Sequence, residues 1–527
     1  MEQRNMILAF VLSLAILVGW STLFPPEKSE SPAPVETTST ATPGKVAATL
    51  PETAPAPVEN VTKASSEAVP SAEGVIAQGQ TFSLGNDLLK VQVNDKGWLT
   101  NVTLLKYRES IEPGSPNVAV LSSGDQHRLY VNDGLIGASA SQPFHITKQD
   151  NDRLVLQTQL NDGREWVKTI TLQKGSYSID VQDRISNGAG LKMYRQAVER
   201  HPDTKLNTFY EHVGPIALIN DKLQEIDYKD LDEKGQIQMA GVGGWVGIMN
   251  RYFITAMIAN KGQDYPYYFK SDGRSYQSGL IDDGKLEGKD AVFQGTIFVG
   301  PKSMPILENL NVGLERSIDF GWFAFMSKPM HSFLLWMYKY IGNFGWCIIL
   351  LVVMIKLLFF WPTQKSYESM AAMRKLQPEM ARLKDLYGDD RQQMSQEMMK
   401  LYKKHQVNPL GGCLPIAVQI PVFFALYKVL LMSIELRQAP FIGWIHDMSV
   451  KDPYFVLPVL MGLSMFVQQR LNPQPSDPTQ AKIMQFLPPI FTVMFLFFPS
   501  GLVLYWMVNN ILSIAQQWYV LKVKKAL

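Results

Sequence analysis

The sequence predicts a polytopic α-helical membrane protein with six transmembrane helices, a large all-β sandwich domain outside the cytoplasm and a cytoplasmic helical hairpin. Three observations predict this class. Apolar residues concentrate at the N-terminus and from residue 341 onward, in runs close to the ~20 residues that cross a bilayer as a helix. Between these regions, short segments alternate apolar and polar residues, as half-buried strands do. A basic, methionine-rich segment interrupts the second apolar region.

The N-terminal region is expected to be an anchor followed by a tether. Residues 1–24 are interpreted as an uncleaved signal-anchor transmembrane helix, because residues 5–24 are mostly apolar and no A-x-A cleavage site follows them directly. Residues 25–78 consist mainly of Pro, Ala, Thr, Ser, Glu and Val and contain no aromatic residue. This composition cannot bury enough surface to fold, so we expect a disordered tether.

Residues 79–320 are predicted to form a large antiparallel sandwich. Turn signals such as Asn161-Asp162-Gly163 and Lys174-Gly175 separate short alternating segments. The expected strands lie within residues 88–95, 153–160, 166–173, 177–186, 244–259 and 291–300. The domain contains no cysteine, so its hydrophobic core rather than disulfides must hold it together.

Residues 321–340 are apolar and aromatic, but Lys328, Pro329, His331 and Lys339 interrupt them. This pattern suits an amphipathic helix that lies in the membrane interface, with Trp and Tyr at the level of the headgroups. A simple lead-in to the next transmembrane helix, residues 341–361, would show the same pattern.

Residues 362–412 show two helical patterns on either side of Gly388-Asp389-Asp390, which predicts a helical hairpin. Methionine is flexible and fits varied apolar partners, so the methionines of this hairpin are candidate contacts for other polypeptides. They could equally hold the two arms of the hairpin together. The candidates are Met370, Met373, Met380, Met394 and Met398.

Four further apolar segments complete the predicted spans. They cover residues 413–432, 453–469, 483–498 and 502–519, and residues 499–501 form a tight turn between the last two. Basic residues concentrate in the hairpin, in the 470–482 loop and in the 520–527 tail, whereas the 433–452 loop has few. The positive-inside rule therefore places both termini and the hairpin in the cytoplasm and the sandwich on the opposite side.

Enzyme chemistry finds no support in the sequence. It contains no zinc-binding pattern, no phosphate-binding loop and no nucleophile elbow, so we predict no catalytic residue, metal or cofactor. Lys and Arg total 50 against 48 Asp and Glu, which gives no indication of direct nucleic-acid binding.

Lys356 is the residue that the apolar segments do not explain. A lysine in the middle of a transmembrane helix costs about 2.5 to 3.5 kcal/mol, which favours a polar cavity around it, although its long stem could also snorkel to the headgroups. No Asp or Glu lies in the five C-terminal spans, so a transient anionic guest is a suitable partner. The predicted groove comprises Lys356, Gln419, Ser464, Thr492, Tyr505, Trp506, Asn509 and Ser513. Hydrogen bonding between helices is the alternative role for its polar members.

Several segments resemble the YidC/Oxa/Albino family of membrane protein insertases over essentially the whole chain, among them GGWVGIMNRYF, SYESMAAMRKLQP, SQEMMKLYKKHQVNPLGGC and FPSGLVLYW. The resemblance implies an insertase and chaperone of the Gram-negative inner membrane with a periplasmic β-supersandwich. It implies nascent membrane proteins, the Sec translocon with its accessory subunits, the ribosome with targeting factors, and the lipid bilayer as partners. The groove arginine of the family corresponds to Lys356, and its groove glutamine corresponds to Gln419.

Two other functions are compatible with parts of the sequence. A transporter would need inverted repeats or paired broken helices, which the sequence does not display. A membrane-tethered periplasmic protein that binds or modifies sugars would place its site in the sandwich.

Overall fold

The computed structural model describes residues 79–522, except residues 125–127, 201, 203–210, 388–389, 406, 408–413 and 473–477. Apart from Glu211, the described residues belong to one compact unit. The predicted signal anchor, the tether and the last five residues of the tail lie outside the described residues.

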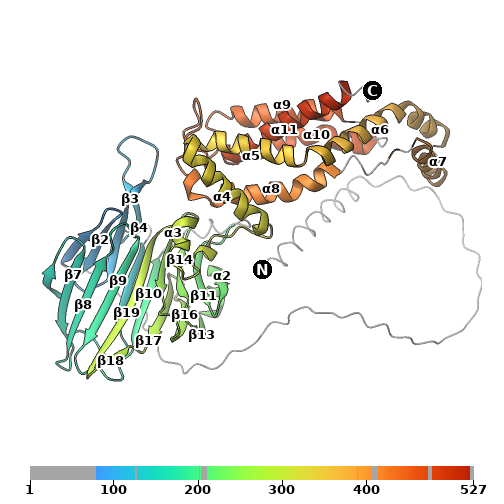
Figure 1. Cartoon of the computed structure of the whole chain (residues 1–527). Helices are drawn as coiled ribbons and strands as arrows, with labels where there is room; N and C mark the ends of the chain where they lie inside the picture. The colour runs from blue at the N-terminus through green and yellow to red at the C-terminus, as the bar shows by residue number, and fades with distance from the viewer. Residues whose placement is uncertain are drawn as a thin grey trace, which may run out of the picture. The chain divides into compact units, whose positions relative to one another are not determined.

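Two antiparallel sheets form the β domain (Figure 1). The first contains, in spatial order, β1 (Thr81–Gly85), β2 (Leu89–Asn94), β3 (Leu99–Arg108), β5 (Arg128–Leu135), β10 (Met193–Arg200), β17 (Ser275–Asp282), β16 (Asp264–Ser271) and β13 (Gln236–Val242), with β4 (Asn117–Leu121) beside β3. The second contains β12 (Lys222–Glu225), β11 (Gly214–Ile219), β14 (Trp245–Met249), β15 (Phe253–Ile258), β19 (Asp290–Pro301), β9 (Ser178–Ile185), β8 (Glu165–Leu172), β7 (Arg153–Gln159) and β6 (His145–Gln149), with β18 (Lys285–Glu287) beside β19. The predicted antiparallel β domain is confirmed.

Glycine occupies two of the predicted turns because the backbone there is left-handed. Gly163 has φ of 85° and Gly175 has φ of 70°, and this left-handed backbone carries little strain only without a Cβ atom. Each glycine reverses the chain between neighbouring strands, β7 to β8 and β8 to β9, and so fixes their antiparallel register.

A buried ionic cluster ties the two sheets together. Lys168 on β8 is fully buried, and its Nζ lies 2.6 Å from Asp133 Oδ2 and 3.0 Å from Asp183 Oδ1. Arg195 lies 3.1 Å from the second oxygen of Asp183. Asp133 and Arg195 belong to the first sheet, whereas Lys168 and Asp183 belong to the second, so the cluster crosses the core.

The helices follow the β domain in the chain, and Figure 1 shows α4 to α11 gathered in one region. The short elements α2 (Tyr228–Lys234), α3 (Met304–Glu308), η2 (Leu314–Ser317) and η4 (Ile434–Leu436) link larger ones. The main helices are α4 (Ala324–Ile341), α5 (Phe344–Leu358), α6 (Phe360–Tyr387), α7 (Arg391–Lys404), α8 (Leu414–Met432), α9 (Val456–Leu471), α10 (Pro478–Phe495) and α11 (Ser500–Lys522).

A sharp bend divides the segment that the sequence suggested as a single helix over residues 341–361. The axes of α5 and α6 meet at 68°, and Phe359 is the residue between them. Pro362 lies in the first turn of α6. Backbone N–H groups in the first turn of a helix have no helical acceptor, so proline, which lacks an N–H, costs no hydrogen bond there. Within the described residues, no individual helix combines the length and apolar composition required to cross a membrane. The bent pair α5–α6 reaches that length and composition only when its two helices are taken together.

The hairpin consists of α6 and α7. The Asp390 carboxylate accepts hydrogen bonds from the backbone N–H groups of Gln392 and Gln393, so it caps α7 as its sequence position predicts. Pro378 lies inside α6 without ending it.

The segment around η4 connects the helices to the β domain. Lys428 of α8 forms an ion pair with Asp319, which precedes α4. Beyond η4, Arg437 donates to the backbone carbonyl of Glu109, directly after β3. These contacts hold the start of α4 and one end of the β domain against the same segment.

Candidate functional site

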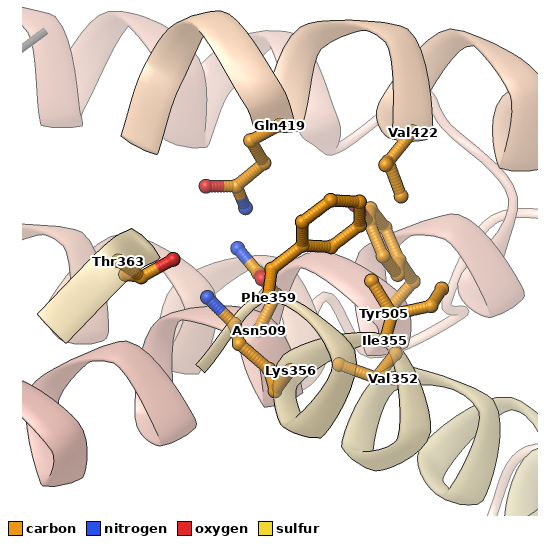
Figure 2. Close-up of a pocket in the computed structure, with 9 residues that line it drawn as sticks. All are labelled: Val352, Ile355, Lys356, Phe359, Thr363, Gln419, Val422, Tyr505 and Asn509. Atoms are coloured by element: carbon orange, nitrogen blue, oxygen red, sulfur yellow. The ribbon is translucent and has the colours of Figure 1, made fainter. Parts of the chain in front are cut away.

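Four residues of the predicted groove line a small pocket between four helices. Lys356 and Phe359 come from α5 and the residue after it, Gln419 from α8, and Tyr505 and Asn509 from α11. Val352, Ile355, Thr363 and Val422 complete the lining. Figure 2 shows the Gln419 amide pointing into the space that Lys356 and Asn509 also face. The cavity measures about 30 Å³, which is room for water but not for a polypeptide segment.

Lys356 is held by a neutral hydroxyl oxygen rather than by an acidic residue. Its Nζ donates a 2.7 Å hydrogen bond to Ser513 Oγ, and Ser513 donates in turn to the backbone carbonyl of Asn509. Among the described residues, no carboxylate pairs with Lys356. The positive charge is therefore solvated by dipoles and available to an anionic group that enters the pocket.

A row of amide side chains on α11 supports the pocket, and the sequence analysis named only Asn509 among them. Gln516 donates to the Phe360 carbonyl at the bend between α5 and α6, and Gln517 donates to the Leu471 carbonyl at the end of α9. Asn510 and Asn509 are buried on the same helix. Asn509 and Gln516, like Asn510 and Gln517, are seven residues or about two helical turns apart, which puts these amides on one side of α11, and this periodicity was the available signal.

Four residues of the predicted groove do not line the pocket: Ser513, which contacts Lys356 from behind the lining, and Ser464, Thr492 and Trp506. Ser464 accepts a hydrogen bond from Asn510, which joins α9 to α11, and it donates to the Met461 carbonyl of its own helix. Thr492 donates to the Pro488 carbonyl within α10. Counted from the cytoplasmic ends of the predicted spans at 1.5 Å per residue, Ser464 and Thr492 lie at about the depth of Lys356, but depth does not specify which way a side chain points around the helix.

Trp506 lies beside the pocket in an aromatic cluster rather than in its lining. Its ring centroid is 4.8 Å from that of Phe423 on α8 and 5.3 Å from that of Phe495 on α10. The Trp506 indole N–H is buried and has no hydrogen-bond partner among the described residues. This cluster makes one side of the site apolar.

The candidate methionines of the hairpin occupy different environments. Met380 is buried with Leu376 and Leu401, and Met398 packs against them, so these side chains join α6 to α7. Met370 packs with Tyr367 and with Val520 of α11. Met373 and Met394 are half-buried, and the neighbouring Met399 is 52% exposed.

The fold and the site define a two-part protein, a helical bundle with a cationic pocket and an attached β domain. A family model described as 60Kd inner membrane protein matches residues 336–526, and a model described as YidC periplasmic domain matches residues 81–333. The chain is 38% identical to the membrane protein insertase YidC of Magnetococcus marinus over 99% of both chains, and 37% identical to that of Aromatoleum aromaticum over 99% of this chain and 98% of the relative. The chain belongs to the YidC family of membrane protein insertases.

A crystal structure of an active YidC insertase is 15% identical, with a TM-score of 0.39, and the match covers 84% of this chain and 93% of that one. Family membership rests on the sequence relatives and confirms the predicted function, an insertase and not an enzyme. It also makes the chain an inner-membrane protein with a periplasmic domain, acting on nascent membrane proteins in contact with lipid. The transporter and sugar-binding alternatives are not supported.

Proposed function

We propose that the pocket around Lys356 is where this insertase receives the polar or acidic part of a client while the apolar part of the client passes into lipid. The observation that carries this proposal is the Lys356 ammonium, buried among helices without an acidic partner in the described residues. A buried cation without a counter-ion is costly, and a client carboxylate supplies the missing charge. Gln419 and Asn509 offer further hydrogen bonds to a polar backbone in transit.

The shortness of two neighbouring helices favours the same function. α9 contains 16 residues and α10 contains 18. At 1.5 Å per residue they measure about 24 and 27 Å, less than the ~30 Å of a bilayer core. A mismatch of this kind thins the membrane locally and lowers the cost of moving a polar segment across it.

The size of the pocket defines a step in the process. A cavity of about 30 Å³ cannot hold an extended chain, so the lining helices must separate when a client enters. We propose that α8 moves away from α5 and α11, because Gln419 lies across the cavity from the polar residues of these helices (Figure 2).

The topology proposed for the chain has six transmembrane helices, with both termini, the hairpin and the tail in the cytoplasm. The charge bias of the loops supports this orientation. We further propose that the hairpin formed by α6 and α7 contacts clients through its methionines, and that the chain works alone or with the Sec translocon and its accessory subunits. Ribosomes and targeting factors are the expected source of clients.

Site-specific crosslinking tests the pocket. A photoreactive amino acid at Gln419 should crosslink to a membrane-protein client arrested during insertion. The same amino acid at Val459, which is 49% exposed on α9, provides a matched control that does not line the pocket. Equal yields at both positions, or none at Gln419 while insertion proceeds, would exclude the pocket as the route. Depletion of the chain, followed by protease mapping of small inner-membrane proteins, tests the insertase function itself.

A further inference from the structure

A second, larger pocket lies at the junction of the β domain and the helices. It measures about 420 Å³, within the range of ligand-binding sites in proteins. Residues from α3, α4 and η4 form its walls, so one side comes from the end of the β domain and the other from α4. The Lys356 pocket shares none of these residues.

The back wall of this pocket is fixed by Glu435 of η4. Its carboxylate accepts a 2.9 Å hydrogen bond from Ser303 Oγ and lies 3.6 Å from His331 Nε2 on α4. Burial alone would raise the pKa of Glu435, but hydrogen bonds from His331 and Ser303 lower it below its usual value. Glu435 therefore stays ionised near neutral pH and is already engaged within the protein.

The open side of the pocket carries one free charge of each sign. Glu308 of α3 and Lys339 of α4 both line the cavity and both are exposed. Within the described part of the chain, neither forms an ion pair or hydrogen bond. Met304, Leu335 and Trp336 supply apolar surface next to these charges. The pocket thus combines an unpaired anion, an unpaired cation and an apolar wall.

The exposed aromatic residues of α4 indicate what surrounds the mouth of the pocket. Phe325, Trp336 and Tyr340 of α4, together with Trp322 just before the helix, are between 53% and 76% exposed. Trp and Tyr in such numbers on one amphipathic helix are typical of the membrane interface. Trp336 also lines the pocket, so the cavity adjoins this aromatic surface.

We propose that the junction pocket binds a phospholipid whose headgroup carries a primary ammonium and a phosphate, as phosphatidylethanolamine does. Glu308 accepts hydrogen bonds from the ammonium, Lys339 contacts the phosphate, and Leu335 and Trp336 pack against the start of the acyl chains. A headgroup without a cation leaves Glu308 unpaired, and a choline headgroup has no N–H group to donate. The site rests on the placement of α4 in the interface and is independent of the Lys356 pocket.

Lipid retention by the full chain tests this proposal. The chain is reconstituted in nanodiscs of equal parts dioleoyl phosphatidylethanolamine, phosphatidylcholine and phosphatidylglycerol, extracted into detergent and examined by native mass spectrometry. We expect one retained phosphatidylethanolamine, favoured about tenfold over the other two lipids, as one charge-assisted hydrogen bond provides. Equal retention of the three lipids, or a preference for phosphatidylglycerol, overturns the proposal.

Variants separate the roles of the two charges. Glu308→Gln should abolish the preference for phosphatidylethanolamine over phosphatidylcholine, and Lys339→Gln should lower the retention of both. Lys328→Gln is the matched control, because Lys328 is exposed on the same helix but does not line the pocket. All three side chains are exposed, so their substitution breaks no buried pair. An unchanged preference in Glu308→Gln contradicts the assignment of that residue.

A separate measurement distinguishes failure of the site from failure of the interface placement. A spin label on Phe325→Cys, a position that is 73% exposed, reports the depth of α4 in the membrane. A label in water shows that α4 lies outside the interface and removes the basis of the site. A label at headgroup depth without lipid preference shows that the placement is right and the pocket assignment is wrong.

Discussion

Lys356 should act through its charge rather than its shape. At about 4 Å from a client carboxylate, the attraction is ~1 kcal/mol in bulk water and ~4 kcal/mol at the effective dielectric constant near a protein surface. The pocket is small but accessible to water, so the attraction falls between these limits. Each 1.4 kcal/mol of attraction lost corresponds to a tenfold slower insertion. We expect Lys356→Arg to retain insertion and Lys356→Met to slow a client with an acidic translocated tail about tenfold. Lys356→Glu should abolish insertion of that client.

The assay is protease protection of the translocated tail after insertion into proteoliposomes, with two clients that differ only in having acidic or neutral tails. Ser513→Ala is the matched control, since it removes the 2.7 Å hydrogen bond to Lys356 but keeps the charge. That variant should cost no more than about 1 kcal/mol. Equal rates for the Arg and Glu variants with the acidic client, or equal slowing of both clients, would refute a role for the charge.

Four further predictions follow from the contacts described. Lys168→Met should destabilise the β domain by about 3 to 5 kcal/mol in chemical denaturation, because it leaves two buried carboxylates with Arg195 as their one remaining cation in the cluster; a loss below 1 kcal/mol would contradict this. Deletion of residues 80–306 should leave basal insertion intact, since the α4 contact with Glu435 through His331 remains, and complete loss in a stably expressed deletion would show otherwise. A cysteine at Leu386, which is 68% exposed on α6, should crosslink to nascent membrane proteins more than one at the buried Met380 and not to a soluble nascent chain; similar yields with both chains would leave the hairpin as scaffold. Because its pKa is lowered in the folded chain, Glu435 stabilises the protein above the usual glutamate pKa, and the melting-temperature gap to Glu435→Gln should close as pH falls below 4.5; a gap that persists would disprove the linkage.

Local patterns in the sequence determined the elements of this protein. Alternating residues predicted strands such as β7 and β8, and glycines at 163 and 175 marked the turns between them. These predictions succeed because strand alternation and turn chemistry depend on neighbours in the chain. The same local reading identified Lys356 as the charge that an apolar helix does not explain, and the family motifs added the function.

Contacts between distant segments were decided only by the tertiary structure. Lys168 reads as a polar residue within an alternating strand, yet it faces the core because Asp133 and Asp183 arrive from two other strands. Likewise, Ser464 and Lys356 lie at similar depth, but the rotation of their helices sends one to Asn510 and the other into the pocket. Sequence periodicity specifies which face of an element is apolar, whereas the partner of that face depends on how all the elements pack. This packing sets the charge, the shape and the neighbours of the site.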